Sequence, residues 1–174
     1  MTELPSSGLV RSPRRREATA ATIETAYRAH AGEFLRVATA IAGSREGGRD
    51  AVQEALTRAL TRRGTFRGSG TVEAWLWKAV VNAARNVRSR SLRVAEGPEA
   101  GTASDDAVDE QRDAIRAAVA ALPERQRHAL FLRYYADLDY AGIAAVLGIS
   151  PGTVGATLNA AHAALRQRLE EVPS

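Results

Sequence analysis

The chain has 174 residues but no cysteine, a single lysine and no apolar run of membrane-spanning length. Without cysteine, a disulfide framework, a cysteine-based zinc site and a thiol nucleophile are all excluded. The arginines near the N-terminus are followed by no apolar segment, so we expect neither a secretory signal nor direct membrane insertion. These absences favour a cytoplasmic protein.

Groups that carry catalysis are equally sparse. The three histidines (His30, His128 and His162) are far apart in the sequence, with no nucleophile or metal-ligand spacing around them. His30 falls on an apolar face and is predicted to belong to the core. The glycine-rich loop at residues 64–70 lacks the Gly-Lys-Ser/Thr of a phosphate-binding loop. We therefore expect no enzyme, no metal or other cofactor, and no small-molecule substrate.

The most informative segment is residues 139–165, which predicts two short helices joined by a tight turn. Gly148 suits the left-handed end of the first helix. Ser150 is a good N-cap for the second helix, and Pro151 suits its first position. The second helix then carries one apolar stripe of Val154, Leu158, Ala161 and Leu165. This pattern is typical of a DNA-binding helix-turn-helix, although an ordinary helical hairpin packed in a bundle is the alternative.

The rest of the chain predicts further helices and no strand. We expect helices from Thr22 to about residue 41, from about 49 to 63, from 71 to about 90 and from about 112 to 122, with Pro123 opening the next. Glycines between 43 and 48 should separate the first two. In the third helix Trp75 is predicted to face the core and Trp77 to lie on the outer surface. The predicted fold class is all-α, with two small helical bundles joined by a flexible acidic linker, the second ending in the helix-turn-helix.

Charge divides the chain into four segments. Residues 1–21 form a predicted disordered basic tail. Residues 22–93 hold 13 Arg/Lys against 6 Asp/Glu, a net charge of +7. The linker at 94–111 has a net charge of −6, and residues 112–174 have a net charge of +1. The positive charge therefore lies on the first helical unit and not on the helix-turn-helix, which is unexpected for a simple repressor.

Several motifs together resemble the bacterial sigma-70 family of RNA polymerase sigma factors. Asp50-Ala-Val-Gln-Glu54, followed by Ala74-Trp-Leu76 and Val81-Asn82, resembles conserved region 2. The segments 122–127, 132–134, 138–140, 143–144 and 147–154 resemble region 4. A chain with these two regions, covering about residues 22–170, looks like the small extracytoplasmic-function (ECF) class. The resemblance implies a non-catalytic subunit that directs core RNA polymerase to promoter DNA and opens it.

The resemblance also implies where the partners bind. The polymerase clamp would contact the second helix, and a carboxylate and an amide on one exposed face suit a basic partner helix. Without the family context, plain solvation of that face would be the simpler interpretation. The third helix and the preceding loop would open the −10 promoter region by stacking, hydrogen bonding and phosphate contact. The candidates are Asp50, Gln53, Glu54 and Arg58 for the polymerase, and Phe66, Trp77, Lys78, Asn82, Arg85 and Arg88 for −10 DNA.

The recognition helix departs from the family pattern. Lys and Arg usually follow Gly-Thr-Val in the family, whereas this chain has mostly Gly and Ala from residue 155 to 163. Without arginine forks, guanine reading and phosphate neutralisation are weakened. Docking to the polymerase is therefore the expected role of the last unit. The polar DNA-binding candidates that remain are Ser150, Thr153, Thr157, Asn159, His162 and Arg166.

Two other functions stay open at the sequence level. One is a helix-turn-helix transcriptional regulator, which would explain neither the +7 unit nor the Asp50–Glu54 motif. The other is a sigma-like regulatory or interaction protein with weakened DNA binding. The sequence also leaves open the promoter, the inducing signal and whether an anti-sigma factor is a further partner.

Overall fold

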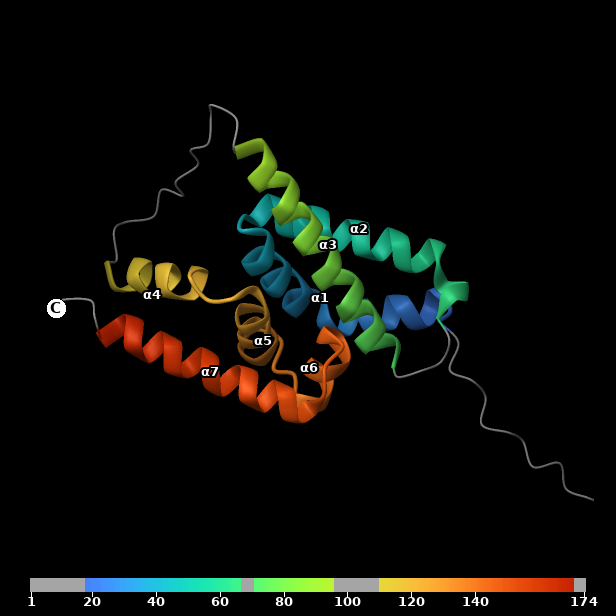
Figure 1. Cartoon of the computed structure of the whole chain (residues 1–174). Helices are drawn as coiled ribbons and strands as arrows, with labels where there is room; N and C mark the ends of the chain where they lie inside the picture. Colours follow the sequence, from blue (N-terminus) through green and yellow to red (C-terminus); the bar gives the residue numbers. More distant parts are fainter. Residues whose placement is uncertain (1–17, 67–70, 96–109, 171–174) are drawn as a thin grey trace, which may run out of the picture.

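The computed structural model describes residues 18–66, 71–95 and 110–170, and in these ranges every regular element is a helix. The helices form a first cluster, α1–α3, and a second cluster, α4–α7 (Figure 1). This confirms the predicted all-α class with two helical bundles. The elements are α1 (Ala20–Ala42), α2 (Arg45–Thr61), the short 3-10 helix η1 (Arg63–Thr65), α3 (Val72–Ala95), α4 (Glu110–Ala120), α5 (Glu124–Tyr134), α6 (Tyr140–Leu147) and α7 (Pro151–Glu170).

The expected tail and linker lie largely outside the described residues. At their edges, α1 begins at Ala20 rather than Thr22, α3 extends to Ala95, and α4 begins at Glu110. The early start of α1 has a local cause. Thr19 caps the helix, because its hydroxyl accepts from the Thr22 amide at 3.1 Å while the Thr22 hydroxyl accepts from the Thr19 amide. This reciprocal capping satisfies amides that the helix itself leaves unpaired.

The turn between α1 and α2 corrects one expectation. Gly47 and Gly48 were predicted to interrupt the helices, but both lie inside α2, which begins at Arg45 with Ser44 as its N-cap. Gly48 is buried against α1, and a Cβ added there would lie 2.7 Å from the Thr39 backbone nitrogen. These glycines therefore allow close helix packing. Of the three glycines in this turn region, only Gly43, with φ of 87°, ends a helix.

The second cluster contains the expected helix-turn-helix. The Asp139 carboxylate caps α6 through the Gly142 amide at 2.7 Å, and Gly148 ends α6 in the left-handed conformation with φ of 69°. Ser150 then caps α7 by accepting from the Thr153 amide at 3.1 Å. α6 and α7 meet at a bend of 97°, the geometry of a helix-turn-helix. The roles of Gly148 and Ser150 were predicted from the sequence, whereas the Asp139 cap was not.

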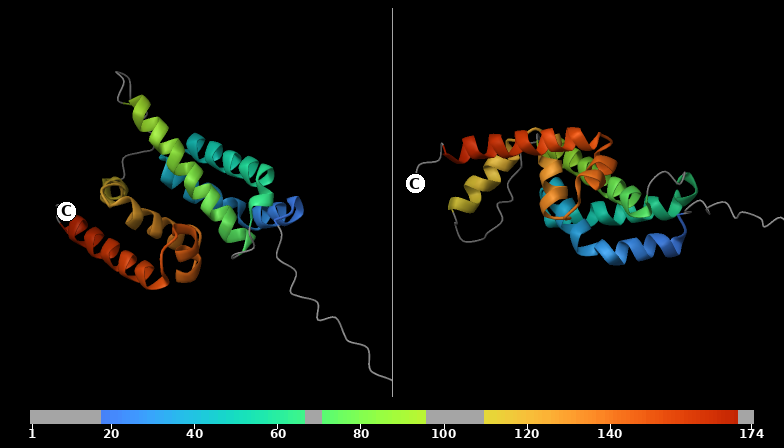
Figure 2. Two further views of the ribbon diagram at one scale, coloured as in Figure 1. Left: turned by 45° about the vertical axis from the view of Figure 1, so that its right-hand side comes forward. Right: turned by 90° about the horizontal axis from the view of Figure 1, so that it is seen from below.

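The two clusters contact each other. α3 contacts α6, and α1 contacts α5, so the helix-turn-helix lies beside the first cluster (Figures 1 and 2). Within the described residues no single helix meets the length and composition of a membrane span; α6 and α7 meet them only when taken together across their bend. The relation between the clusters decides which candidate residues are accessible.

Candidate polymerase and nucleic-acid interface

The four residues predicted to bind polymerase share one face of α2. Together with Thr57 they line a shallow depression of about 430 Å³. The helical spacing explains this grouping, because residues three and four positions apart lie on the same side of a helix. The depression is lined by Asp50, Gln53, Glu54, Thr57 and Arg58.

Within this face, Glu54 differs from its neighbours. Its carboxylate forms ion pairs with Arg58 on its own helix and with Arg90 of α3, the latter at 3.2 Å. Glu54 is half-buried, whereas Asp50 and Gln53 are exposed. Glu54 therefore ties α2 to α3 besides contributing charge, and the Arg90 partner had no signal in the sequence.

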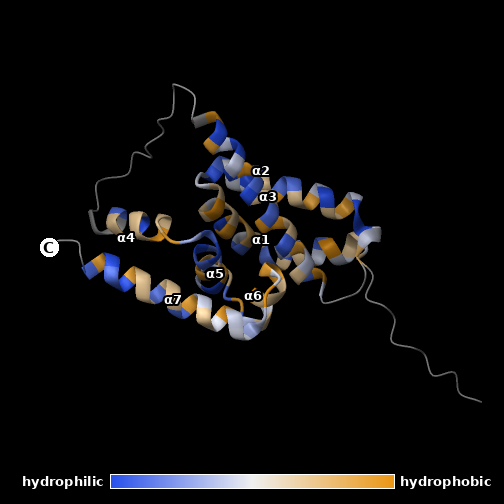
Figure 3. Ribbon diagram, viewed as in Figure 1, coloured by the Kyte–Doolittle hydropathy of each residue, from blue (hydrophilic) through white to orange (hydrophobic). Residues whose placement is uncertain are grey.

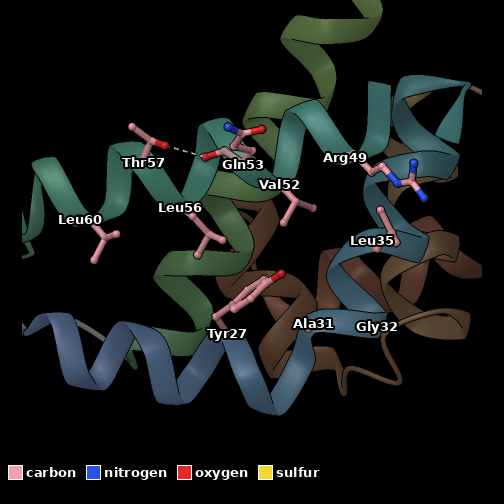
Figure 4. Close-up of a pocket in the computed structure, with 10 residues that line it drawn as sticks. All are labelled: Tyr27, Ala31, Gly32, Leu35, Arg49, Val52, Gln53, Leu56, Thr57 and Leu60. Carbon is pink, nitrogen blue, oxygen red and sulfur yellow. Dashed lines mark hydrogen bonds between the residues drawn. The ribbon is translucent and has the colours of Figure 1, made fainter. Parts of the chain in front are cut away.

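An apolar groove adjoins the polar face. It has a volume of about 620 Å³ and lies between α1 and α2 (Figure 4). Gln53 and Thr57 line both the groove and the polar depression, so the two surfaces are continuous. The groove residues are Tyr27, Ala31, Gly32, Leu35, Arg49, Val52, Gln53, Leu56, Thr57 and Leu60. An apolar groove with a polar rim suits an amphipathic helix of a partner protein.

Five of the six candidates for −10 DNA lie on α3, and the sixth, Phe66, follows η1. Lys78, Asn82, Arg85 and Arg88 are all exposed on its surface. Arg88 also reaches back across the first cluster, where its guanidinium occupies the space that a Cβ on Gly43 would fill. The loop at 67–70, which completes the predicted base-reading region, lies outside the described residues.

Trp77 corrects the sequence-based expectation of an exposed stacking platform. Its side chain is only 2% exposed, and its ring packs on Phe34 of α1 with centroids 4.3 Å apart. Trp75, predicted to face the core, is half-buried and contacts Phe66 at 5.7 Å. The interpretation failed because α1 presents Phe34 to that side of α3. In this structure Trp77 is a core residue and the Phe66–Trp75 pair is the more accessible aromatic unit.

Arg85 joins the two clusters. Its Nε lies 2.5 Å from the Glu124 carboxylate in the first turn of α5. The same carboxylate is 3.8 Å from Nδ1 of His128, which is buried at 4% exposure. Burial lowers the pKa of His128 to about 4, against the opposing attraction of Glu124, so the imidazole is neutral at pH 7.

Most polar candidates in the helix-turn-helix are engaged within the protein. Ser150 serves as the N-cap, and the Thr157 hydroxyl donates to the Thr153 carbonyl at 2.7 Å. The His162 ring hydrogen-bonds the Tyr134 hydroxyl at 2.8 Å. Figure 3 shows pale colours at the start of α7 and hydrophilic colour gathering toward its C-terminal end. Asn159 and Arg166 are exposed.

Comparisons with known families agree with these two units. Residues 26–93 match the family model described as Sigma-70 region 2, and residues 112–165 match Sigma-70, region 4. Together the two matches cover well over half of the chain. The chain belongs to the sigma-70 family, and its pairing of regions 2 and 4 is that of an ECF sigma factor.

Solved structures show the same fold. The sigma factor RpoE in complex with the anti-sigma factor NepR from Bartonella quintana matches with a TM-score of 0.63 at 20% identity, over 86% of this chain and 98% of that one. CnrH in complex with the cytosolic domain of CnrY matches with a TM-score of 0.65 at 19% identity, over 87% of this chain and 89% of that one. No curated protein sequence matches this chain significantly.

Proposed function

We propose that this sigma factor docks on core RNA polymerase through the exposed face of α2 and opens promoter DNA through α3. The observation that carries the docking surface is the grouping of Asp50, Gln53, Glu54 and Arg58 in one depression. A basic helical partner would pair with the carboxylates and the amide. Its apolar side would enter the neighbouring groove, where Leu56 and Leu60 are available. Such a protein acts in the cytoplasm, with the polymerase.

In promoter opening, the exposed polar residues of α3 would have different roles. Asn82 offers both a donor and an acceptor to a base edge, which suits recognition of a flipped base. Lys78, Arg85 and Arg88 are placed for phosphates. Aromatic stacking falls to Phe66 and Trp75 rather than Trp77, because Trp77 is enclosed by α1.

The second cluster would contribute less to DNA binding than α3 does. α7 presents no cation before Arg166, and the hydroxyls and imidazole of Thr157 and His162 already have partners within the protein. Phosphate contact through α7 would therefore be weak. Attachment to the polymerase is the role that its surface supports better.

We further propose that an anti-sigma factor binds this chain. RpoE, which shares its fold, was solved with the anti-sigma factor NepR, and CnrH, which also shares it, was solved with the cytosolic domain of CnrY. The apolar groove between α1 and α2 is a candidate part of that contact as well. An anti-sigma factor seated there would compete directly with polymerase docking.

Reconstitution with purified core polymerase tests the function. The chain should support runoff transcription from a cognate promoter, and the double variant Asp50→Arg/Gln53→Arg should lose both holoenzyme formation and transcription. Glu24→Arg, which reverses an exposed carboxylate on α1, is a control for charge reversal elsewhere in the first cluster and should behave as the unmodified chain. Polymerase binding without transcription would favour the alternative of a sigma-like interaction protein. DNA binding without polymerase binding would favour a helix-turn-helix regulator.

A further inference from the structure

α1 is not one continuous helix. His30 has φ of −127° and ψ of 16°, which lie outside the helical values, so Ala20–Ala42 consists of two helical halves that meet at a break. Figure 4 shows α1 turning at Ala31 and Gly32, directly after this residue. α1 contains no proline, the usual cause of a sharp kink. The break is therefore held by the side chains around it.

The half after the break has the features of a helix start. The Glu33 carboxylate accepts a hydrogen bond from its own backbone amide, which lowers the pKa of Glu33, and it also pairs with Arg36 at 3.0 Å. Amides in the first turn of a helix lack partners within it, and a carboxylate is favoured there. The half-buried His30 ring packs on Phe34 and on Trp77, with centroids 6.0 and 6.3 Å apart. The break is thus anchored to the core of the first cluster.

The two halves of α1 are unequally anchored. The half before the break buries two side chains, whereas the half after it buries five. A segment with few buried apolar contacts has a lower local stability than its neighbours. Residues 20–29 therefore move at lower cost than residues 31–42. The buried side chains are those of Ile23 and Ala26 before the break, and of Phe34, Val37, Ala38, Ile41 and Ala42 after it.

The apolar groove between α1 and α2 spans the break. Tyr27 lies before it and Leu35 after it, and both line the groove. The Tyr27 ring points from α1 toward α2, where Leu56 lies on the opposite side (Figure 4). A change in the angle between the two halves of α1 would move Tyr27 relative to Leu56. The backbone at His30 therefore controls the width of the groove.

We propose that residues 20–29 form a movable wall of the docking groove, with the break at His30 as the hinge that fits this wall to the amphipathic polymerase helix. The inference rests on the proposed function, because it takes the groove as part of the polymerase contact. Closing the wall on the apolar side of the partner helix buries Tyr27, which offsets the cost of moving a lightly anchored segment. His30 is a positioning residue and touches no partner itself.

Two substitutions at His30 separate the backbone effect from the loss of the ring. His30→Ala and His30→Asn both remove the imidazole, but alanine favours an unbroken helix, whereas asparagine favours non-helical backbone. Because the chain has no cysteine, Ala21→Cys in the wall and Thr61→Cys on α2 place nitroxide labels at exposed sites. Pulsed electron paramagnetic resonance of the free chain should give a distance peak that shifts in His30→Ala and keeps its position in His30→Asn.

Polymerase binding should follow the hinge and not the stability of the chain. His30→Ala should bind core polymerase about threefold more weakly than His30→Asn, a factor that corresponds to the difference in helix propensity between the two residues. The melting temperature of His30→Ala should nevertheless equal or exceed that of His30→Asn, because alanine is the better helix former. A purely structural role of His30 would instead lower melting temperature and affinity together in both variants.

Two results would overturn the inference. One is an identical distance peak in His30→Ala and His30→Asn. The other is equal polymerase affinity of these two variants while Asp50→Arg/Gln53→Arg still loses binding. The distance measurement requires neither polymerase nor promoter. A failure of the proposed docking surface, seen as polymerase binding that survives Asp50→Arg/Gln53→Arg, is therefore distinguishable from a failure of the hinge.

Discussion

The ring of Tyr140, at the start of α6, lies over Gly155 of α7: a Cβ added to Gly155 would be 3.3 Å from Tyr140 Cε2. Glycine inside a helix costs about 1 kcal/mol relative to alanine, so from sequence alone Gly155 is a weak point of the recognition helix. The contact with Tyr140 explains why glycine occupies this position. The missing side chain leaves room for the ring.

The first prediction concerns this pair of residues. Gly155→Ala alone should change the free energy of unfolding little, because the gain in helix propensity is offset by the tight contact with the ring. In a Tyr140→Ala background the same change should stabilise the chain by about 1 kcal/mol. Urea denaturation of the four chains gives the coupling energy. Additive effects would show that the ring moves aside freely.

Local chemistry made most of the helical framework predictable. Ser150 and Gly148 mark the two sides of the turn between α6 and α7, and both act through their own backbone neighbourhood. The same local logic failed at Gly47 and Gly48. Whether these two glycines break a helix or allow close packing depends on how closely α1 approaches α2. The local sequence gives no information about that distance.

The candidate site was predictable in part. Helical spacing alone places Asp50, Gln53 and Glu54 on one face, and the structure has them there. Burial of Trp77 could not be anticipated, because it depends on Phe34 more than 40 residues earlier in the sequence. The pairing of Arg85 with Glu124 likewise depends on contact between the two clusters, for which neither segment carries a signal.

The second prediction concerns His128 and pH. An unfolded histidine binds its proton near the ordinary value of 6.5, whereas burial lowers the pKa of His128 to about 4. Between these values the unfolded state binds more protons, so stability is complete above pH 6.5 and falls as the pH is lowered toward 4. From pH 7.5 to 5 this group should cost about 2 kcal/mol. His128→Leu should remove that part of the pH dependence in urea denaturation; an unchanged profile would contradict it.

A third prediction separates docking from stability on α2. Glu54→Arg should lower the melting temperature, because it places a cation between Arg58 and Arg90. Asp50→Arg should leave the melting temperature unchanged, because Asp50 is exposed, yet it should weaken binding to core polymerase. Thermal unfolding monitored by circular dichroism and co-purification with polymerase measure the two effects. Equal losses of stability would mean that Asp50 also supports the fold.

A fourth prediction distinguishes base reading from phosphate contact on α3. Asn82→Ala should cost about 1–3 kcal/mol of discrimination at one promoter position. Arg88→Ala should instead weaken binding to all sequences and reduce the salt dependence. Holoenzyme binding to single-base promoter variants, together with permanganate detection of melting, separates the two. Unchanged promoter choice in Asn82→Ala would remove that residue from the base-reading role.

The last prediction follows from the lack of charged residues in α7 before Arg166. Ala156 and Ala160 are exposed, so Ala156→Arg together with Ala160→Arg should add two phosphate contacts and steepen the slope of log affinity against log salt by about 0.9 for each. Gly155→Lys together with Thr157→Arg should do less, because Gly155 lies under Tyr140 and Thr157 is half-buried. Fluorescence anisotropy of the full chain on candidate −35 duplexes at several salt concentrations compares the two pairs. If both pairs steepen the slope equally, neither the contact of Gly155 with Tyr140 nor the partial burial of Thr157 limits phosphate contact by side chains at these positions.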